Sequence, residues 1–118
     1  MRVQPLFPMA SPAPDRFRGT VQRWSIDAGP LAGSTCDYTF HDDWSVSWRV
    51  VTGARQGHGG RAREFRAQAV NAETATVAFS VAPGVTVVAT LDFARRRLAG
   101  YQVTPTALEP LAGTLRIL

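Results

Sequence analysis

The sequence predicts an all-β protein that folds as a single small antiparallel up-and-down β-barrel of about eight strands. From Thr35 to Leu118, apolar and polar residues alternate in short segments, which is the period of strands with one buried face. Turn residues separate these segments, and we find no internal repeat, no heptads and no clear helical period. A small sheet of this kind usually closes on itself, leaving room inside for side chains or for one small ligand.

The first part of the barrel is expected to contain a strand, a hairpin and a loop. Residues 20–27 predict a strand with one mixed face. Residues 35–40 and 44–51 predict a hairpin whose polar turn is His41-Asp42-Asp43, and we expect Asp37 and Arg49 to pair across it. Residues 52–60 contain four glycines, so we expect an irregular loop there.

The second part is expected to be a run of five further strands joined by short connections. Alternating apolar side chains predict strands over residues 64–70, 74–81, 85–93, 98–103 and 111–118. Prolines punctuate the last connection, where a short helix over 104–108 is one possibility. The strand over residues 20–27, the two strands of the hairpin and these five strands give about eight strands. Each can be reached from the previous one by a short loop.

The chain of 118 residues is expected to form one domain with an amino-terminal extension. Residues 1–15 contain Pro5, Pro8, Pro12 and Pro14, which predicts an extended arm. Residues 16–118 are expected to form the barrel, with Phe17 as the first anchor in its core.

Charge and composition bear on the partners that are expected. All 13 basic residues are arginine and the formal net charge is +4, but the absence of lysine and the single asparagine are typical of a GC-rich genome. The basic character therefore gives weak support to nucleic-acid binding, and we expect no nucleic-acid partner. The longest uncharged stretch, residues 74–91, contains Pro83-Gly84, so we expect no membrane span. The lone Cys36 and a proline-rich amino terminus favour the cytoplasm.

Several short motifs resemble the calycin-type, lipocalin-like barrels of the MoaF-like and phenolic acid decarboxylase group. The matching pieces are Phe17-x-Gly19, Trp24-x-Ile26-Asp27-x-Gly29, Trp48-Arg49-Val50 running to Thr52-Gly53, the glycine-rich stretch to Gly60, Ala78-Phe79-Ser80 with Pro83-Gly84, and Leu91-Asp92-Phe93. They cover roughly residues 17–103 and consist of motifs and spacing without long identity. The resemblance implies a barrel that encloses a small-molecule site, and related barrels often form homodimers.

The catalytic residues of the decarboxylases in this group are not matched here. The resemblance implies two tyrosines on the first strand, an arginine in the glycine-rich loop and a glutamate deeper in the barrel. Those positions are occupied by Trp24, Ile26, His58 and Val81. Because none of these side chains supplies the same group, we do not expect phenolic acid decarboxylation, unless Arg55 or Arg61 acts from a nearby place.

Aromatic side chains on different strands are the candidates for a ligand pocket. If they converge inside the barrel, the rings of Trp24, Tyr38, Trp48, Phe79 and Tyr101 would line an apolar pocket for a planar or hydrophobic molecule. Packing in the core is the alternative for each ring taken singly. Arg61, just after the glycine-rich loop, is a candidate to bind a ligand carboxylate, and a solvated arginine is the alternative.

His58 is the best candidate for proton transfer, because histidine titrates near neutral pH and this one lies between glycines. A loop histidine with no function is the alternative. His41 with Asp42 and Asp43 lacks a fourth ligand, so we expect no metal and no other cofactor. Ser25, Ser45, Ser47 and Ser80 have neither a GxSxG context nor a histidine at a telling spacing, which does not support a serine hydrolase.

The leading hypothesis is a cofactor-independent lyase, isomerase or cyclase that acts on a small apolar or aromatic metabolite inside the barrel, in a bacterial biosynthetic pathway. His58 and Tyr38 would be catalytic, and Trp24, Trp48, Arg61, Phe79 and Tyr101 would bind the substrate. The alternatives are a lipocalin-like binder without chemistry and a structural domain with a filled barrel. A homodimer is also possible.

Overall fold

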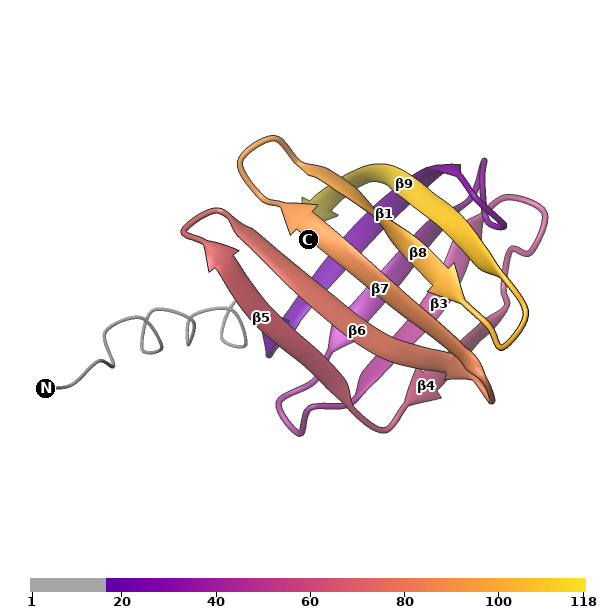
Figure 1. Cartoon of the computed structure of the whole chain (residues 1–118), viewed down its shortest axis with the longest axis horizontal. Coiled ribbons are helices and arrows are strands. Elements are labelled where there is room, and N and C mark those ends of the chain that lie inside the picture. Colours follow the sequence, from indigo (N-terminus) through magenta and orange to yellow (C-terminus); the bar gives the residue numbers. More distant parts are fainter. Residues whose placement is uncertain (1–16) are drawn as a thin grey trace, which may run out of the picture.

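The computed structural model describes residues 17–118, which form one nine-stranded antiparallel sheet coiled into a nearly closed barrel (Figure 1). The expected arm over residues 1–15 lies outside the described residues. The strands are β1 (Thr20–Ala28), β2 (Thr35–Phe40), β3 (Val46–Thr52), β4 (Gly59–Ala62), β5 (Phe65–Asn71), β6 (Thr74–Ala82), β7 (Val85–Asp92), β8 (Arg97–Val103) and β9 (Leu108–Ile117). The prediction of an all-β antiparallel barrel is confirmed.

The strand order around the barrel is β4-β3-β2-β1-β9-β8-β7-β6-β5. Each strand pairs with its neighbours in the sequence, and β1 pairs with β9 to join the two halves. The exception is β4 and β5, which follow each other in the chain but form the two ends of the sheet. β4 instead packs beside β6 without pairing, so the barrel has one seam that no backbone ladder among residues 17–118 closes.

The ninth strand arises within the glycine-rich segment that was expected to be an irregular loop. β4 pairs with β3, and Gly60 lies opposite Trp48. A Cβ atom on Gly60 would lie 2.6 Å from Cζ2 of Trp48, so glycine lets the strand pass beneath the indole. The expectation of a loop over 52–60 is therefore wrong at its carboxyl end, where the absence of side chains permits pairing.

The helix considered for residues 104–108 is not formed. The amide of Thr104 donates to the carbonyl of Ala107 over 2.9 Å, which closes a tight turn, and β9 begins at Leu108. Pro110 lies within β9 opposite Tyr101 of β8, beyond the point where β9 meets β1. Proline is tolerated there because β9 no longer pairs with β1 at this position, so the ladder needs no amide donor on that side.

Aromatic rings fill the middle and one end of the barrel. Trp24 is fully buried, with its ring centroid 4.2 Å from that of Tyr38 and 6.3 Å from that of Phe79. Phe17 is also fully buried and packs against Phe40, Phe65 and Phe93 at the end of the barrel where β2 and β7 finish. The expected role of Phe17 as a core anchor is confirmed.

One amide lies in this apolar interior. Gln22 is fully buried on β1, and its Oε1 accepts a hydrogen bond of 3.1 Å from the indole Nε1 of Trp24. Its Nε2 has no hydrogen-bond partner among the described residues. Leaving a buried donor unpaired costs roughly 1–3 kcal/mol. The bond to Trp24 offsets part of that cost and fixes the orientation of the indole.

The carboxylate of Asp37 joins β2 to β1 and not to β3. Asp37 lies opposite both Arg23 and Arg49, but it accepts hydrogen bonds from Nε and Nη2 of Arg23 over 2.7 and 2.9 Å. The expected pair with Arg49 is therefore wrong, because the bidentate geometry is satisfied by Arg23. The hydrogen bond from Arg23 is the main cause that lowers the pKa of Asp37.

This pairing predicts a pH-dependent contribution to stability. A lowered pKa means that the contribution is complete above the ordinary pKa of 3.8 and is lost as the pH falls through the value in the folded protein. We expect Asp37→Asn to reduce the free energy of unfolding at neutral pH and to reduce it less as the pH falls below about 4. Urea denaturation at several pH values measures this difference, and a difference independent of pH would contradict the assignment.

A second prediction concerns the close approach of β9 to β1. A Cβ atom on Gly113 would lie 2.1 Å from the carbonyl oxygen of Ser25, whereas one on Gly33 would meet nothing within 4 Å. We expect Gly113→Ala to lower the free energy of unfolding by about 2–3 kcal/mol because the strands must separate. Gly33→Ala is the control and carries only the strain of its positive φ, about 1 kcal/mol. Equal losses in chemical denaturation would refute the close approach.

Candidate functional site

A cavity of about 370 Å³ is lined in part by residues of the β1–β2, β3–β4 and β6–β7 loops. These loops lie at one end of the barrel, opposite the end that holds the Phe17 cluster (Figure 1). Its walls are mainly apolar. The apolar lining comes from Pro30, Leu31, Trp48, Val50, Val81, Ala82, Val85 and Val87, and the polar lining from Cys36, Tyr38, Arg55, His58 and Gln102. Five strands contribute inward side chains, because alternate residues of each strand face the interior.

The inner end of the cavity carries two neutral hydrogen-bonding groups. Cys36 and Tyr38 are both buried on β2, two residues apart on its inner face. Burial is the main cause that raises the pKa of the Cys36 thiol and the pKa of the Tyr38 phenol. Both groups therefore keep their protons at neutral pH and offer a ligand uncharged polar contacts.

The basic groups of the cavity come from the β3–β4 loop. The amide of His58 donates to the carbonyl of Arg55 over 2.9 Å, and the carbonyl of His58 accepts from the amide of Val50 over 2.8 Å. Gly57 has a φ of 91° and donates to the carbonyl of Val50, which closes the turn. These bonds hold the backbone of His58 against β3. The side chain of His58 is exposed and lies at the cavity mouth.

Three of the side chains proposed from the sequence line this one cavity: Tyr38, Trp48 and His58. Trp24 and Phe79 do not line it, because they lie in the packed core beneath it. Both contact Tyr38, with ring centroids at 4.2 and 5.6 Å, and Phe79 also stacks on Trp48 at 6.2 Å. Trp24 and Phe79 therefore support the rings that line the cavity but would not contact a ligand in it.

Tyr101 and Arg61 lie on the outer surface of the barrel. Tyr101 is 47% exposed. Leu98 and Gln102 face the inside of the barrel, so Tyr101, one residue before Gln102, faces the outside. Arg61 lies opposite Ser47 on the outer face of β4, and its Nη2 donates to Oγ of Ser45 over 2.7 Å. A ligand in the cavity would contact neither side chain.

The sequence gives weak signals for the remaining polar groups of the cavity. Neither Cys36 nor Gln102 is among the site residues proposed from the sequence. Alternate side chains of β8 face the same side, so Gln102 shares a face with the buried Leu98. This alternation is the sequence signal that could have identified Gln102. Arg55 stands in the glycine-rich loop, but its approach to the cavity depends on the turn at Gly57.

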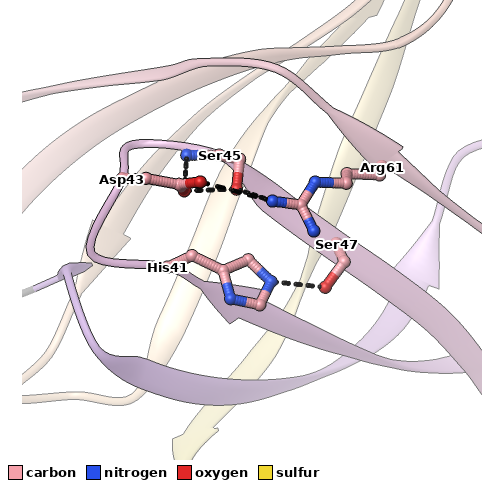
Figure 2. Close-up of polar contacts among 5 residues, drawn as sticks. All are labelled: His41, Asp43, Ser45, Ser47 and Arg61. Atoms are coloured by element: carbon pink, nitrogen blue, oxygen red, sulfur yellow. Dashed lines mark hydrogen bonds and ion pairs between the residues drawn. The ribbon is translucent and has the colours of Figure 1, made fainter.

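A second group of polar side chains lies on the outer face near the β2–β3 turn (Figure 2). His41 Nε2 and Ser47 Oγ are 2.9 Å apart, a contact that the sequence spacing did not reveal. The nearby carboxylate of Asp43 accepts hydrogen bonds from the hydroxyl and amide of Ser45, which are the main causes that lower its pKa. Because Asp43 binds Ser45 instead of orienting His41, the group lacks the arrangement of a nucleophile, base and carboxylate. It ties the turn to Arg61 of β4.

Comparison with known proteins supports the fold. No protein family and no curated protein matches this sequence. A crystal structure described as a "putative beta-lactamase" from Burkholderia vietnamiensis is similar, with a TM-score of 0.73 and 25% sequence identity over 86% of this chain and 95% of that chain. This similarity and the strand topology agree with a nearly closed barrel of the general calycin-like type. No helix within residues 17–118 is long and apolar enough to cross a membrane.

The state of Cys36 gives a test of the cavity description. Because its thiol is buried and its pKa is raised, we expect Cys36 to react with a soluble disulfide reagent at least ~100-fold more slowly than an exposed cysteine. Absorbance of the released thiolate measures the rate, and Ala99→Cys on the outer face of β8 provides the exposed reference. Comparable rates for the two cysteines would contradict the burial of Cys36.

Proposed function

We propose that this protein binds one small apolar or aromatic molecule inside the barrel, with the polar end of that molecule at the mouth. The observation that carries this proposal is the cavity of about 370 Å³ with apolar walls, a neutral inner end and basic groups at its entrance. Ligand sites of small molecules range from about 300 to 1,000 Å³, so a molecule of one or two rings suits this volume.

The distribution of polar groups favours one orientation of the ligand. Tyr38 and Cys36 offer uncharged contacts at the buried end, where an unpaired charge would be costly. Arg55 and His58 lie at the mouth, and a planar guanidinium binds a carboxylate or sulfonate in two places. An acidic group on the ligand would therefore point outward, with the ring against Trp48 and Val87.

Catalysis by a lyase, isomerase or cyclase is the second candidate, and His58 is the feature that favours it. Its side chain lies on the same cavity as Tyr38, and histidine is the side chain that ordinarily exchanges protons near neutral pH. No carboxylate lines the cavity within the described residues, and the phenol and thiol stay protonated. Such a reaction would depend on holding the substrate in a reactive shape and on one proton carried by His58.

Neither resemblance adds a reaction to this proposal. MoaF-like membership remains a prediction from short motifs. The β-lactamase description belongs to the similar structure alone, since serine enzymes of that kind use a lysine and this chain contains none. Residues 17–118 also contain no group of three or more histidine, cysteine, aspartate or glutamate side chains placed to hold a metal ion.

Binding can be tested with two fluorescent probes, the anionic 1-anilinonaphthalene-8-sulfonate and the uncharged N-phenyl-1-naphthylamine. We expect both to bind the folded protein, and Val87→Trp to abolish binding by filling the cavity. Val88→Trp on the outer face of the same strand is the matched control, because Val88 does not line the cavity and the variant should bind normally. Arg55→Gln should weaken the anionic probe roughly 10-fold and leave the neutral probe unchanged. Binding that survives Val87→Trp in a folded variant would remove the cavity from the proposal.

A ligand that copurifies with the protein separates binding from catalysis. Mass spectrometry identifies the molecule before and after long incubation with fresh protein. Recovery of the unchanged molecule supports a binding protein. Conversion by the native protein and not by His58→Ala supports catalysis, whereas full turnover by His58→Ala removes that residue from the scheme.

A further inference from the structure

Arginine side chains gather at the end of the barrel opposite the cavity mouth, where the β7–β8 turn and the last residues of β9 lie (Figure 1). Arg95, Arg96 and Arg97 are exposed in and next to this turn, and Arg116 is exposed on β9. The guanidinium of Arg95 lies 3.3 Å from the carboxylate of Asp92. The other three arginines make no ion pair with a side chain of residues 17–118. They are therefore available to an anion from outside the chain.

The backbone brings two of these arginines to one groove. Arg96 has a φ of 58°, in the left-handed region that residues other than glycine rarely adopt. Its carbonyl accepts a hydrogen bond of 3.0 Å from the amide of Leu115, which ties the β7–β8 turn to β9. As a result, Arg96 and Arg116 line the same surface groove, which has a volume of about 420 Å³.

The rest of this groove is apolar. Its other lining residues are Phe93, Leu115 and Ile117. Leu115 is buried, whereas Ile117, two residues later on the same face of β9, is 48% exposed. The apolar face of β9 therefore continues beyond the core into solvent, directly beside guanidinium groups.

Two more large apolar side chains are exposed at the same end of the barrel. Trp44 lies in the β2–β3 turn, with the guanidinium of Arg18 5.1 Å from its ring centroid, and Val70 near the end of β5 is 61% exposed. The acidic residues Asp42 and Glu73 lie in the β2–β3 and β5–β6 turns. Positive charge is thus concentrated on the side of the β7–β8 turn, whereas exposed apolar side chains are distributed around the whole end.

We propose that this end of the barrel docks on the surface of a lipid bilayer that contains anionic phospholipids. Arg96, Arg97 and Arg116 would bind lipid phosphates, because a planar guanidinium contacts two phosphate oxygens at once. Ile117 would insert at the boundary between head groups and acyl chains, where burial of apolar area adds to the attraction between charges. The cavity mouth, at the other end of the barrel, would remain in water.

The combination of features favours a bilayer over other anionic partners. A nucleic acid would use the arginines but would leave Ile117 and Val70 in water. A protein partner concentrates its binding energy in one central cluster, whereas the apolar side chains here are spread around a rim. A planar interface contacts such a rim at several points, and tryptophan is enriched at membrane interfaces.

Binding to vesicles tests the role of the charges. We expect the native chain to bind vesicles of phosphatidylcholine mixed with phosphatidylserine and to bind vesicles of phosphatidylcholine alone much more weakly. A basic residue next to an anionic surface contributes about fivefold in affinity, so Arg96→Gln with Arg97→Gln should weaken binding roughly 25-fold. Arg49→Gln with Arg63→Gln removes the same charge from exposed positions on β3 and in the β4–β5 link, and should bind nearly as well as the native chain. Flotation in a density gradient measures the bound fraction.

A second pair of variants tests the insertion of an apolar side chain. Ile117→Ser should weaken binding to the anionic vesicles roughly 10-fold, because it removes apolar area that the lipid would bury. Leu108→Ser is the matched control, since Leu108 is 61% exposed at the other end of β9. It should bind like the native chain. Equal losses for the two variants would contradict docking through the end that carries Ile117.

A polarity-sensitive dye tests the orientation independently. Ala94→Cys places a dye in the β7–β8 turn and Ala54→Cys places one in the β3–β4 loop, and both alanines are exposed. The native Cys36 is buried and should remain unlabelled. On addition of anionic vesicles, we expect the emission of the dye at position 94 to shift to shorter wavelength and that of the dye at position 54 to stay unchanged. A shift at position 54 alone would reverse the orientation and overturn the proposal.

Three further results would overturn it. The native chain would fail to bind anionic vesicles, or the variant Arg96→Gln with Arg97→Gln, folded by circular dichroism, would bind them like the native chain. Binding to duplex DNA as tight as binding to vesicles, with Ile117→Ser unaffected in both, would identify a nucleic-acid or nonspecific polyanion surface. Arg116→Gln, on a regular strand, repeats the charge test with an expected loss of about fivefold if the variant in the turn does not fold.

Discussion

The packing of Phe79 against the rings around it closes the barrel where the backbone does not. β4 and β6 share no ladder, so the seam between them depends on side chains. Phe79 of β6 stacks on Trp48 of β3 with centroids 6.2 Å apart, and the indole of Trp48 in turn covers Gly60 of β4. This layer of rings spans the seam from the inside, and burial of their large apolar surface stabilises the closed form.

The same layer divides the interior into a filled half and an open half. On one side, Phe17 packs against Phe40, Phe65 and Phe93 and fills the end of the barrel. On the other side, Tyr38 and Trp48 line the cavity, and Trp24 and Phe79 pack against these rings from the core. Core packing therefore holds the rings that line the candidate site, while Arg55 and His58 reach it from a loop.

The barrel class was predictable from alternation, whereas the composition of the site was only partly so. Eight strands follow from period-2 patterns, but β4 depends on contacts between Gly60 and Trp48 that no local pattern contains. Alternation along β8 places Gln102 on the inner face with Leu98 and Tyr101 on the outer face. The prediction placed Tyr101 in the pocket because aromatic side chains commonly line such pockets. Arg61 illustrates the same limit, since its partners on the β2–β3 turn are 16 and 18 residues away.

The open edge of β5 and the seam have a common origin in the short link between β4 and β5. Two residues, Arg63 and Glu64, join these strands, and at Phe65 the amide that could begin a β4–β5 ladder is already bound by the carbonyl of Trp44. Trp44 adopts a φ of 72°, which a bulky residue rarely does, so the turn that carries this carbonyl is itself held under strain. The strained turn at Trp44 therefore contributes to keeping β4 and β5 apart as the two ends of the sheet formed by residues 17–118.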